Sequence, residues 1–428
     1  MGRPKGKTVM IRFIFTLLSI LLPAFLVFWF FQDGTVFFAS DIFFYIFLEF
    51  IFLFIAKVSK NPIYIEVGKR IVSSKLAAVS LFIIFFYGSI ATLDSIHYQK
   101  KMRDEAGKIM YDKSNSPRYS NIRSVLDTLL IQCYKGVEES NGNIVINTEK
   151  RYSKPFASTE FDPVYKPNPV TGKNDVIYQP LKYPKAHIFG TDKAGGDIFY
   201  KILKGTRTAI IVGLVTTLIA VPFAMAFGIT AGYFGGIIDD IIQFIYTTIS
   251  SIPSILLITS LVLIVKNLLS ATTIEAIQRR DDSLLLGLCI ILGILGWSGL
   301  CRLLRAETLK LKELDFVQAA RALGTNHFNI ILKHIVPNVT HIILISFILQ
   351  FSGLVMVETI LSYLKIGVPT TIGSWGRIID EARNELSRDP IVYWPLLASF
   401  LAMFVLILAV NFLGDVIRDA LDPKLRKG

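Results

Sequence analysis

The stretch Arg302–Pro337, RLLRAETLKLKELDFVQAARALGTNHFNIILKHIVP, lies between two long apolar runs and decides how the chain is interpreted. Four apolar residues recur in it at the i, i+3, i+4 and i+7 spacing of one helical stripe: Phe316, Ala319, Ala320 and Leu323. Gly324 then predicts a left-handed turn, and Asn326 predicts the cap of a second helix that runs into the next apolar run. Pro337 lies near the start of that run, where its missing amide hydrogen does no harm. We therefore expect two helices joined by a glycine turn and held close to a membrane.

This two-helix segment admits three interpretations. An amphipathic helix lying on the membrane surface is the simplest of them, but such helices carry bulky apolar side chains. The small patch of Ala319 and Ala320 beside Gly324 favours close docking of a partner protein instead. A helix-turn-helix that reads DNA also uses such a turn, but the short connections to the flanking runs would keep this one from a groove.

The composition of the 428-residue chain is that of a membrane protein. Hydrophobic residues make up 52% of it and charged residues only 18%, where soluble domains carry about 25% charged residues. An ordinary soluble enzyme is thereby excluded. The apolar residues are clustered in eight runs, most of them near the ~20 residues that a spanning helix needs: 13–31, 42–56, 76–93, 209–233, 237–265, 284–301, 335–363 and 393–413. We predict an all-α polytopic membrane protein with about eight transmembrane helices.

The formal net charge of +12 is explained by where the basic residues fall. Lys and Arg are concentrated in four segments, 3–12, 57–75, 302–333 and 418–427, whereas the loop 32–41 has none. Cytoplasmic loops of membrane proteins are enriched in Lys and Arg, so we expect these segments, and with them both termini, in the cytoplasm. The basic charge is therefore a topology signal for a multi-pass protein of the cytoplasmic (inner) membrane, and we expect no nucleic-acid partner.

Three regions divide the chain. Residues 1–93 form an N-terminal membrane region with three predicted spans, and residues 187–428 form a membrane core with the others. Between them, residues 94–186 form a hydrophilic block that the parity of the spans places outside the cytoplasm, as an extracytoplasmic domain or loop. Asn141-Gly142 predicts a hairpin turn in this block. Cys133 is its only cysteine, so no disulfide can form within it.

The sequence shows no pattern of residues for chemistry. Gly2 and Gly6 are spaced somewhat like a phosphate-binding loop, but three residues separate them where the motif needs four. The histidines lack metal-ligand spacing except for His334 and His341, which packing at the mouth of a span explains better than a metal. We expect no catalytic residue, no metal site and no cofactor in this chain.

Five stretches together resemble a known family. Gln318–Gly324, QAARALG, with Ile335-Val-Pro337, resembles the EAA signature of membrane subunits of binding-protein-dependent ATP-binding-cassette (ABC) importers. Four further stretches, over about 187–428, resemble the C-type membrane subunit of oligopeptide and dipeptide permeases: Gly190–Asp197 with Gly205-Thr-Arg207, Ala231–Gly236, Glu358–Leu364 and Asn411–Pro423. The first of these contains the motif residues Gly190, Thr191, Asp192, Gly195, Asp197 and, beyond it, Arg207.

The resemblance implies a type I ABC importer permease core, built from the last five to six helices, that moves peptides across the membrane by alternating access. It implies four kinds of partner: a second, B-type membrane subunit, two cytoplasmic ATPase subunits that bind ATP and Mg²⁺, an extracytoplasmic peptide-binding protein and membrane lipid. It also implies that the segment 306–337 couples the chain to the ATPases, through Phe316, Gln318, Ala319, Ala320, Leu323, Gly324, Ile335 and Pro337.

The sequence also departs from the family pattern. Gln318 replaces the usual Glu, and Gly196 stands where many members have Arg, as in the microcin-C-type peptide permeases. The family has one span before the Gly190–Asp197 motif, whereas this chain has three predicted spans. Nickel or another small solute stays open as the cargo, and a secondary transporter or a membrane receptor stays open as a different class.

Two acidic residues within apolar runs are candidates for function. Glu358 lies about twenty residues into its run and is a candidate for the substrate path, with packing as the alternative. For Glu49, in the short second run, we expect a contact between helices.

Overall fold

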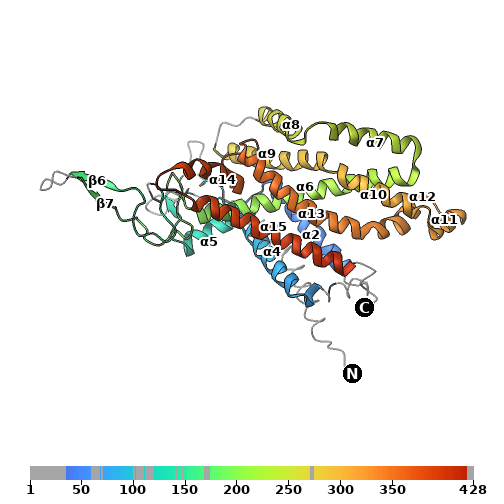
Figure 1. Ribbon diagram of the computed structural model, residues 1–428, viewed down its shortest axis with the longest axis horizontal. Coiled ribbons are helices and arrows are strands. Elements are labelled where there is room, and N and C mark those ends of the chain that lie inside the picture. Colours follow the sequence, from blue (N-terminus) through green and yellow to red (C-terminus); the bar gives the residue numbers. More distant parts are fainter. Residues whose placement is uncertain are drawn as a thin grey trace, which may run out of the picture.

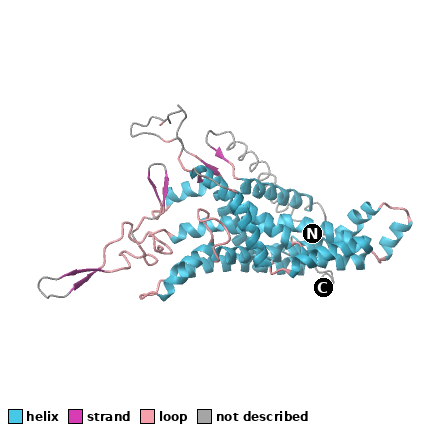
Figure 2. Ribbon diagram, turned by 90° about the horizontal axis from the view of Figure 1, so that it is seen from above, coloured by secondary structure: helices cyan, strands magenta, loops and turns pink. Residues whose placement is uncertain are grey.

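The computed structural model describes residues 35–58, 68, 71–99, 102, 110, 120–140, 143–146, 148–149, 151–167, 174–269 and 274–421. These residues form an elongated helical bundle with short strands and loops gathered at one end (Figures 1 and 2). The first expected span, 13–31, lies outside the described residues, as do most of the basic segment 57–75 and the tail 422–428.

Five helices of the described chain are long and apolar enough to cross a membrane. They are Lys75–Asp94 (α4), Ile198–Phe234 (α6), Ala276–Leu311, His327–Tyr363 and Trp394–Ala420. The third combines α9 (Ile274–Gly296) with α10 (Ser298–Leu311), the fourth combines α12 (His327–Ile330), the π-helical turn η1 (Ile331–Ile335) and α13 (Val336–Tyr363), and the fifth belongs to α15 (Trp394–Leu421). The predicted helical membrane fold is thereby confirmed, with strands added only in short sheets.

The expected run 237–265 is not one straight span, and the sequence prediction is wrong in this respect. It forms α7 (Gly236–Ser251) and α8 (Ser254–Leu268), which meet at an angle of 87°. Pro253 lies in the break, and because proline has no amide hydrogen it cannot continue the helical hydrogen bonds of α7. Counted as one broken span, the pair brings the number of spans in the described residues to six.

The second expected span corresponds to α2 (Ala39–Val58), a helix of 20 residues. It packs against α6 and α9. Glu49 is exposed on α2, so it is not buried between the described helices, and the contact that we expected stays a prediction.

The helix α6 is the centre of the bundle and packs against α10, α9, α13 and α4. Gly228 and Gly232 lie where it meets α10. A Cβ atom at Gly228 would come within 2.6 Å of the Cys301 carbonyl oxygen, and one at Gly232 within 2.7 Å of the Arg305 carbonyl oxygen. The two backbones therefore approach closely only because these positions have no side chain.

Several of the membrane helices are longer than the apolar runs that predicted them. The expected run 284–301 begins at Ile274 in α9, and the run 209–233 begins at Ile198 in α6. The added residues include Asp281 and Asp282, which are buried although both are acidic. The predicted spans end at these charges because the prediction used hydrophobicity alone. In the structure, side chains from other helices pair with the charges, so the helices continue through them.

The strands all lie at one end of the bundle, here called the strand end (Figure 1). A three-stranded antiparallel sheet has the order β1 (Thr35–Val36), β2 (His97–Tyr98) and β3 (Arg123–Ser124). Two hairpins follow, β4 (Glu138–Ser140) with β5 (Asn143–Val145), and β6 (Val164–Pro167) with β7 (Asn174–Ile177). Because β4 and β5 flank Asn141-Gly142 and pair in register, the predicted hairpin is confirmed.

Three short helices complete the strand end: α5 (Val125–Cys133), α14 (Trp375–Arg383) and the 3₁₀ turn η2 (Asn384–Ser387). The block 94–186 does not pack only on itself. Tyr152 and Phe161 of the block form one buried cluster with Val392 and Trp394 of the membrane core. The opposite end of the bundle carries α11 (Asp315–Ala322) and α12 and is here called the α11–α12 tip (Figure 1).

Candidate functional site

The α11–α12 tip has the local structure that its sequence predicts. Gly324 has a φ of +75°, in the left-handed region, directly after α11. The Phe328 amide donates a hydrogen bond of 3.1 Å to the side-chain oxygen of Asn326, which caps α12. The predicted glycine turn and the predicted cap are therefore confirmed.

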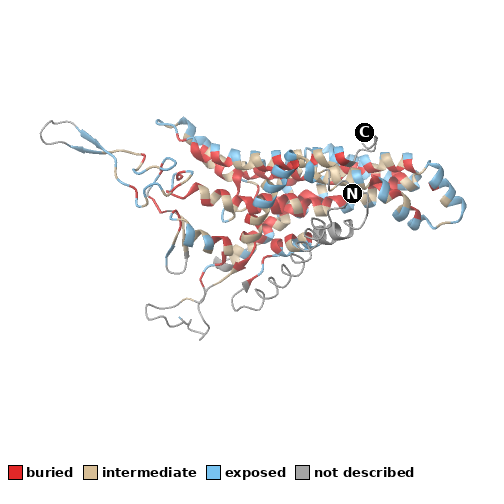
Figure 3. Ribbon diagram, turned by 90° about the horizontal axis from the view of Figure 1, so that it is seen from below, coloured by how far each residue is buried: buried red, intermediate tan, exposed pale blue. Residues whose placement is uncertain are grey.

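The predicted apolar stripe of α11 faces solvent. Val317 is the buried residue of this helix, whereas Phe316 and Ala319 are exposed, Ala320 is half-buried, and Leu323 is 85% exposed. Most of the α11–α12 tip is coloured as exposed in Figure 3. Burying apolar surface is favourable, so a stripe left open in water is typical of an interaction site. Other exposed apolar side chains continue it on the same tip: Leu314, Phe328 and Leu332.

Two members of the expected coupling set differ from the stripe. Ile335 is fully buried in a cluster with residues of α6, α10 and α13, so it anchors the tip to the bundle and is not part of its exposed face. Pro337 lies in the first turn of α13, as predicted, and is exposed.

Gln318 closes the turn that precedes α11. Its side-chain Nε2 donates a hydrogen bond of 2.9 Å to the carbonyl oxygen of Lys312, the C-cap of α10. The last carbonyls of a helix have no partner within the helix, so this amide satisfies one of them. A glutamate cannot donate such a bond, which gives the departure from the family pattern a structural role.

Polar contacts hold the tip, and the helix α10 before it, to the rest of the bundle. Tyr233, at the end of α6, places its Oη 2.8 Å from His327 Nδ1 at the start of α12. Arg305 of α10 donates two hydrogen bonds to Asp239 of α7, of 2.5 Å to Oδ1 and 2.6 Å to Oδ2.

At the strand end, the Gly190–Asp197 motif forms the cap of α6. Asp197 Oδ1 accepts a hydrogen bond of 2.8 Å from the Tyr200 amide, and its Oδ2 accepts one of 2.5 Å from the Tyr134 hydroxyl. His187 Nδ1 lies 2.7 Å from the same Oδ2, and its Nε2 lies 3.4 Å from Glu149 Oε1. Burial alone would lower the pKa of His187, but the two carboxylates outweigh it and hold that pKa above its ordinary value.

The other motif residues fix the loop that leads to this cap. Thr191 Oγ1 accepts a hydrogen bond of 2.7 Å from the Ser153 amide, which ties the loop to the block 94–186. Asp192 Oδ1 accepts hydrogen bonds from the amides of Ala194 and Gly196, at 2.8 and 2.9 Å. Gly190 and Gly195 have φ values of +70° and +75°, which explains why the motif has glycine at both positions.

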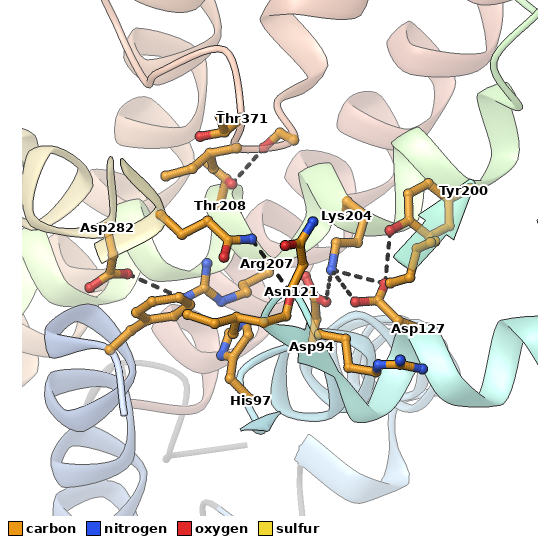
Figure 4. A pocket seen from close by; sticks show the side chains of 17 residues that line it. Asp94, His97, Asn121, Asp127, Tyr200, Lys204, Arg207, Thr208, Asp282 and Thr371 are labelled. Atoms are coloured by element: carbon orange, nitrogen blue, oxygen red, sulfur yellow. Dashed lines mark hydrogen bonds and ion pairs between the residues drawn. The ribbon is translucent and has the colours of Figure 1, made fainter. Parts of the chain in front are cut away.

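A cluster of charges, all buried except the partly buried Lys204, lies beside this cap, and we call it the strand-end charge cluster (Figure 4 draws it without Asp41). Its members come from five helices: Arg207 and Lys204 of α6, Asp41 of α2, Asp94 of α4, Asp127 of α5 and Asp282 of α9. They line or adjoin a cavity of about 250 Å³.

Each cation of the cluster has two carboxylates. Arg207 Nη2 lies 2.6 Å from Asp41 and 3.5 Å from Asp282, and it also donates a hydrogen bond of 3.0 Å to the Ser40 hydroxyl. Lys204 Nζ lies 2.5 Å from Asp94 and 3.1 Å from Asp127. Because buried ions are tolerated only when paired, α6 depends at this point on residues from 1–93 and from the block 94–186.

The charge on Asp127 shows how strong this pairing is. Burial by itself would raise the pKa of its carboxyl. The Lys204 ammonium and hydrogen bonds from the Ser124 amide and the Tyr200 hydroxyl reverse this effect and hold the pKa of Asp127 below its ordinary value.

Comparison with known proteins identifies the family. The family described as binding-protein-dependent transport system inner membrane component matches residues 224–427. The oligopeptide transport system permease protein OppC of Haemophilus influenzae is 32% identical over 240 residues, which are 56% of this chain and 71% of that protein. The glutathione transport system permease protein GsiD of Pectobacterium atrosepticum is 33% identical over 242 residues, 56% of this chain and 74% of that protein. This chain belongs to that family.

A third relative extends the comparison to a dipeptide permease. The dipeptide transport system permease protein DppC of Lactococcus lactis is 30% identical over 258 residues, 60% of this chain and 70% of that protein. The chain is therefore an ABC importer permease, a multi-pass membrane subunit and not itself an enzyme. The resemblance inferred from five sequence stretches is confirmed.

Within this permease, Glu358 is a packed residue. Its carboxylate is buried and accepts hydrogen bonds of 2.7 Å from the Ser362 hydroxyl and 2.8 Å from the Ser374 hydroxyl. These contacts join the end of α13 to the start of α14. Packing, the alternative to a substrate-path role, accounts for its position here, and the substrate-path role stays a prediction.

The charge cluster is the feature that sequence reasoning missed. Asp41, Asp94 and Asp282 lie at or just beyond the edges of apolar runs, a position that is also typical of solvated helix ends. Lys204 and Arg207 lie at the start of another run. Charges at the ends of spans can pair with one another, so these positions are the signal in the sequence that could have predicted the cluster. Which carboxylate meets which cation depends on the arrangement of the helices and cannot be read along the chain.

Proposed function

We propose that this permease is one of two membrane subunits of an importer that carries peptides across the cytoplasmic membrane. Family membership makes it an importer permease, and the names of its relatives suggest the cargo. Those relatives transport oligopeptides, dipeptides and glutathione, which is itself a small peptide. The single observation that supports peptides as the cargo is that these relatives, about 30% identical to the chain, are all named for peptide transport.

The proposed partners are a B-type permease, two cytoplasmic ATPases and an extracytoplasmic peptide-binding protein. The ATPases would bind ATP and Mg²⁺, and this chain alone should show no ATP hydrolysis. The exposed stripe on the α11–α12 tip supports docking of the ATPases there, because it leaves large apolar side chains in water.

In this proposal the α11–α12 tip and both termini lie in the cytoplasm, and the strand end lies outside. The basic residues around the tip support this orientation. The cysteines provide a direct test, because Cys133 is exposed at the strand end whereas Cys289 and Cys301 are buried. A membrane-impermeant maleimide should label intact cells at Cys133, and a Cys133→Ser variant should lose the label. Labelling that appears only after the cells are opened would reverse the orientation.

The proposed mechanism is alternating access. Closure of the ATPases on ATP would displace the α11–α12 tip, and the buried anchors of the tip, Ile330 and Ile335, would transmit this displacement to the spans. Rigid packed helices then rock between two arrangements that open the path on either side. Hydrolysis of ATP resets the cycle.

The test substitutes aspartate within α11. Ala320→Asp places a charge on the stripe and should weaken ATPase association by at least about 30-fold, the effect of a central interface residue, and abolish peptide uptake. Ala322→Asp is the matched control: this residue is exposed on the same helix but lies off the stripe, so its ATPases should stay bound. The measurements are co-purification of the ATPases and uptake of a labelled peptide. If the Ala320→Asp variant binds its ATPases and transports peptide normally, this face of α11 does not couple the permease to the ATPases.

A further inference from the structure

The contact between Tyr233 and His327 joins two parts of the permease that are distant in sequence. Tyr233 is the penultimate residue of α6, and His327 is the first residue of α12. Besides the 2.8 Å contact between Oη and Nδ1, the two rings pack edge to face with centroids 5.6 Å apart. Phe234 packs on the same imidazole, with a centroid distance of 5.9 Å. The imidazole is thus held by the last two side chains of α6.

The position of this contact gives it mechanical importance. The helix α6 has 37 residues and is roughly 55 Å long. Its opposite end carries Lys204 and Arg207, which the strand-end charge cluster fixes to four other helices. A displacement of α12 that reaches Tyr233 therefore acts on one continuous helix, with Pro222 in its interior, that extends to the other end of the bundle.

The contact between Tyr233 and His327 differs from the neighbouring contacts because it joins the tip directly to α6. Arg305 and Asp239 join α10 to α7 and do not involve the tip itself. On the tip, α11 is followed by the Gly324 turn, around which no atom lies within 4 Å of a Cβ placed there. Among the described residues, the contact between Tyr233 and His327 is the polar link between the tip and α6.

We propose that Tyr233 and His327 are positioning residues that pass the movement of the tip to α6, so that breaking their contact separates ATP hydrolysis from transport. This inference rests on the proposed function, because it assumes that the ATPases act on the tip. It assigns a role to residues outside the predicted coupling set, one of them in the Ala231–Gly236 stretch, which lies at the C-terminal end of α6.

The experiment uses the complete importer, reconstituted in liposomes with its partner subunits and peptide-binding protein. The readout is the number of peptides transported for each ATP hydrolysed. Tyr233→Phe keeps the ring and removes the hydroxyl, so hydrolysis should stay within about two-fold while this ratio falls about five-fold, the equivalent of one hydrogen bond. His327→Leu should give the same fall, and the double variant should be no worse than either single one, because all three break one contact.

Two variants act as controls. His327→Asn keeps a polar atom near the position of Nδ1 and should retain most of the wild-type ratio. Tyr246→Phe makes the same change on α7, where the Arg302 guanidinium lies over the ring, 4.9 Å from its centroid, a contact that phenylalanine preserves. Its ratio should equal that of the wild type.

The outcomes separate this inference from the function on which it rests. An unchanged ratio in Tyr233→Phe, or uptake and hydrolysis that fall in equal proportion, overturns the positioning role. A wild-type chain that binds no ATPase, or that carries no peptide, overturns the proposed function itself.

Discussion

The two ends of the permease differ in whether their side chains find partners within the chain. At the strand end, Arg207 and four carboxylates are buried, and with the partly buried Lys204 they pair with one another within the chain. At the α11–α12 tip, the apolar side chains of Phe316, Leu323 and Phe328 are exposed. Buried charges are stable only in fixed arrangements, whereas exposed apolar surface gains from a partner. At the strand end the chain itself supplies the partners of its buried charges. At the α11–α12 tip, we expect another subunit to cover the exposed apolar side chains.

The largest effect is expected at the strand-end charge cluster. Arg207→Met removes a buried cation and leaves Asp41 and Asp282 without it, which should destabilise the protein by about 3–5 kcal/mol. Arg151→Met is the matched control, because the Arg151 side chain is 70% exposed and its pair with Asp162 is worth at most about 1 kcal/mol. Thermal unfolding of the purified protein measures both. Equal stabilities for the two variants would show that the cluster does not fix α6.

A smaller effect is expected at the turn of the tip. Gly324 has a φ of +75° and open space around it, so Gly324→Val costs only the conformational strain of a left-handed valine, about 1–2 kcal/mol. The strain should tilt α11 and weaken co-purification of the ATPases while the protein stays in the membrane. Gly353→Val is the control, since a Cβ there also meets open space but the backbone φ is ordinary. Undiminished ATPase binding by Gly324→Val would remove the turn from the coupling mechanism.

The third prediction concerns pH at the strand end. The pKa of His187 is raised in the folded protein above its ordinary value of 6.5, so protonated His187 stabilises the fold. This stabilisation is fully present below about pH 6.5 and is lost as the pH rises through the raised pKa. His187→Asn keeps a hydrogen-bonding group but does not titrate, so this part of the pH dependence should vanish. The check is the unfolding midpoint of both proteins between about pH 5.5 and 8.5; identical profiles would contradict it.

The smallest effect is expected for Gln318→Glu. The resemblance to the EAA signature alone predicts that this change is tolerated, because the signature usually has Glu at this position. The structure adds a cost: glutamate cannot donate to the Lys312 carbonyl, so one exposed hydrogen bond of about 1 kcal/mol or less is lost. ATPase association measured by titration should therefore weaken by no more than about five-fold. A complete loss of association would mean that Gln318 itself contacts the ATPase.

Much of the tip could be predicted because its determinants are local. Gly324 follows a helical stripe, and Asn326 precedes the next helix by one residue, so both features depend on neighbours within a single turn of chain. The membrane helices were predictable for a related reason, since apolar runs of about 20 residues are self-sufficient in a bilayer. The same local character explains the Asn141-Gly142 hairpin.

The sequence by itself therefore determined the class of the protein, most of its straight spans and the two-helix segment with its apolar stripe. Only the tertiary structure decided that Asp41, Asp94 and Asp127 meet the cations of α6, that α7 and α8 meet at 87°, and that Tyr233 reaches His327. Asp41 and Arg207 are 166 positions apart, and Tyr233 and His327 are 94 apart. Periodicity and capping report interactions within a few residues along the chain, whereas these pairs exist only because packing of the helices brings their faces together.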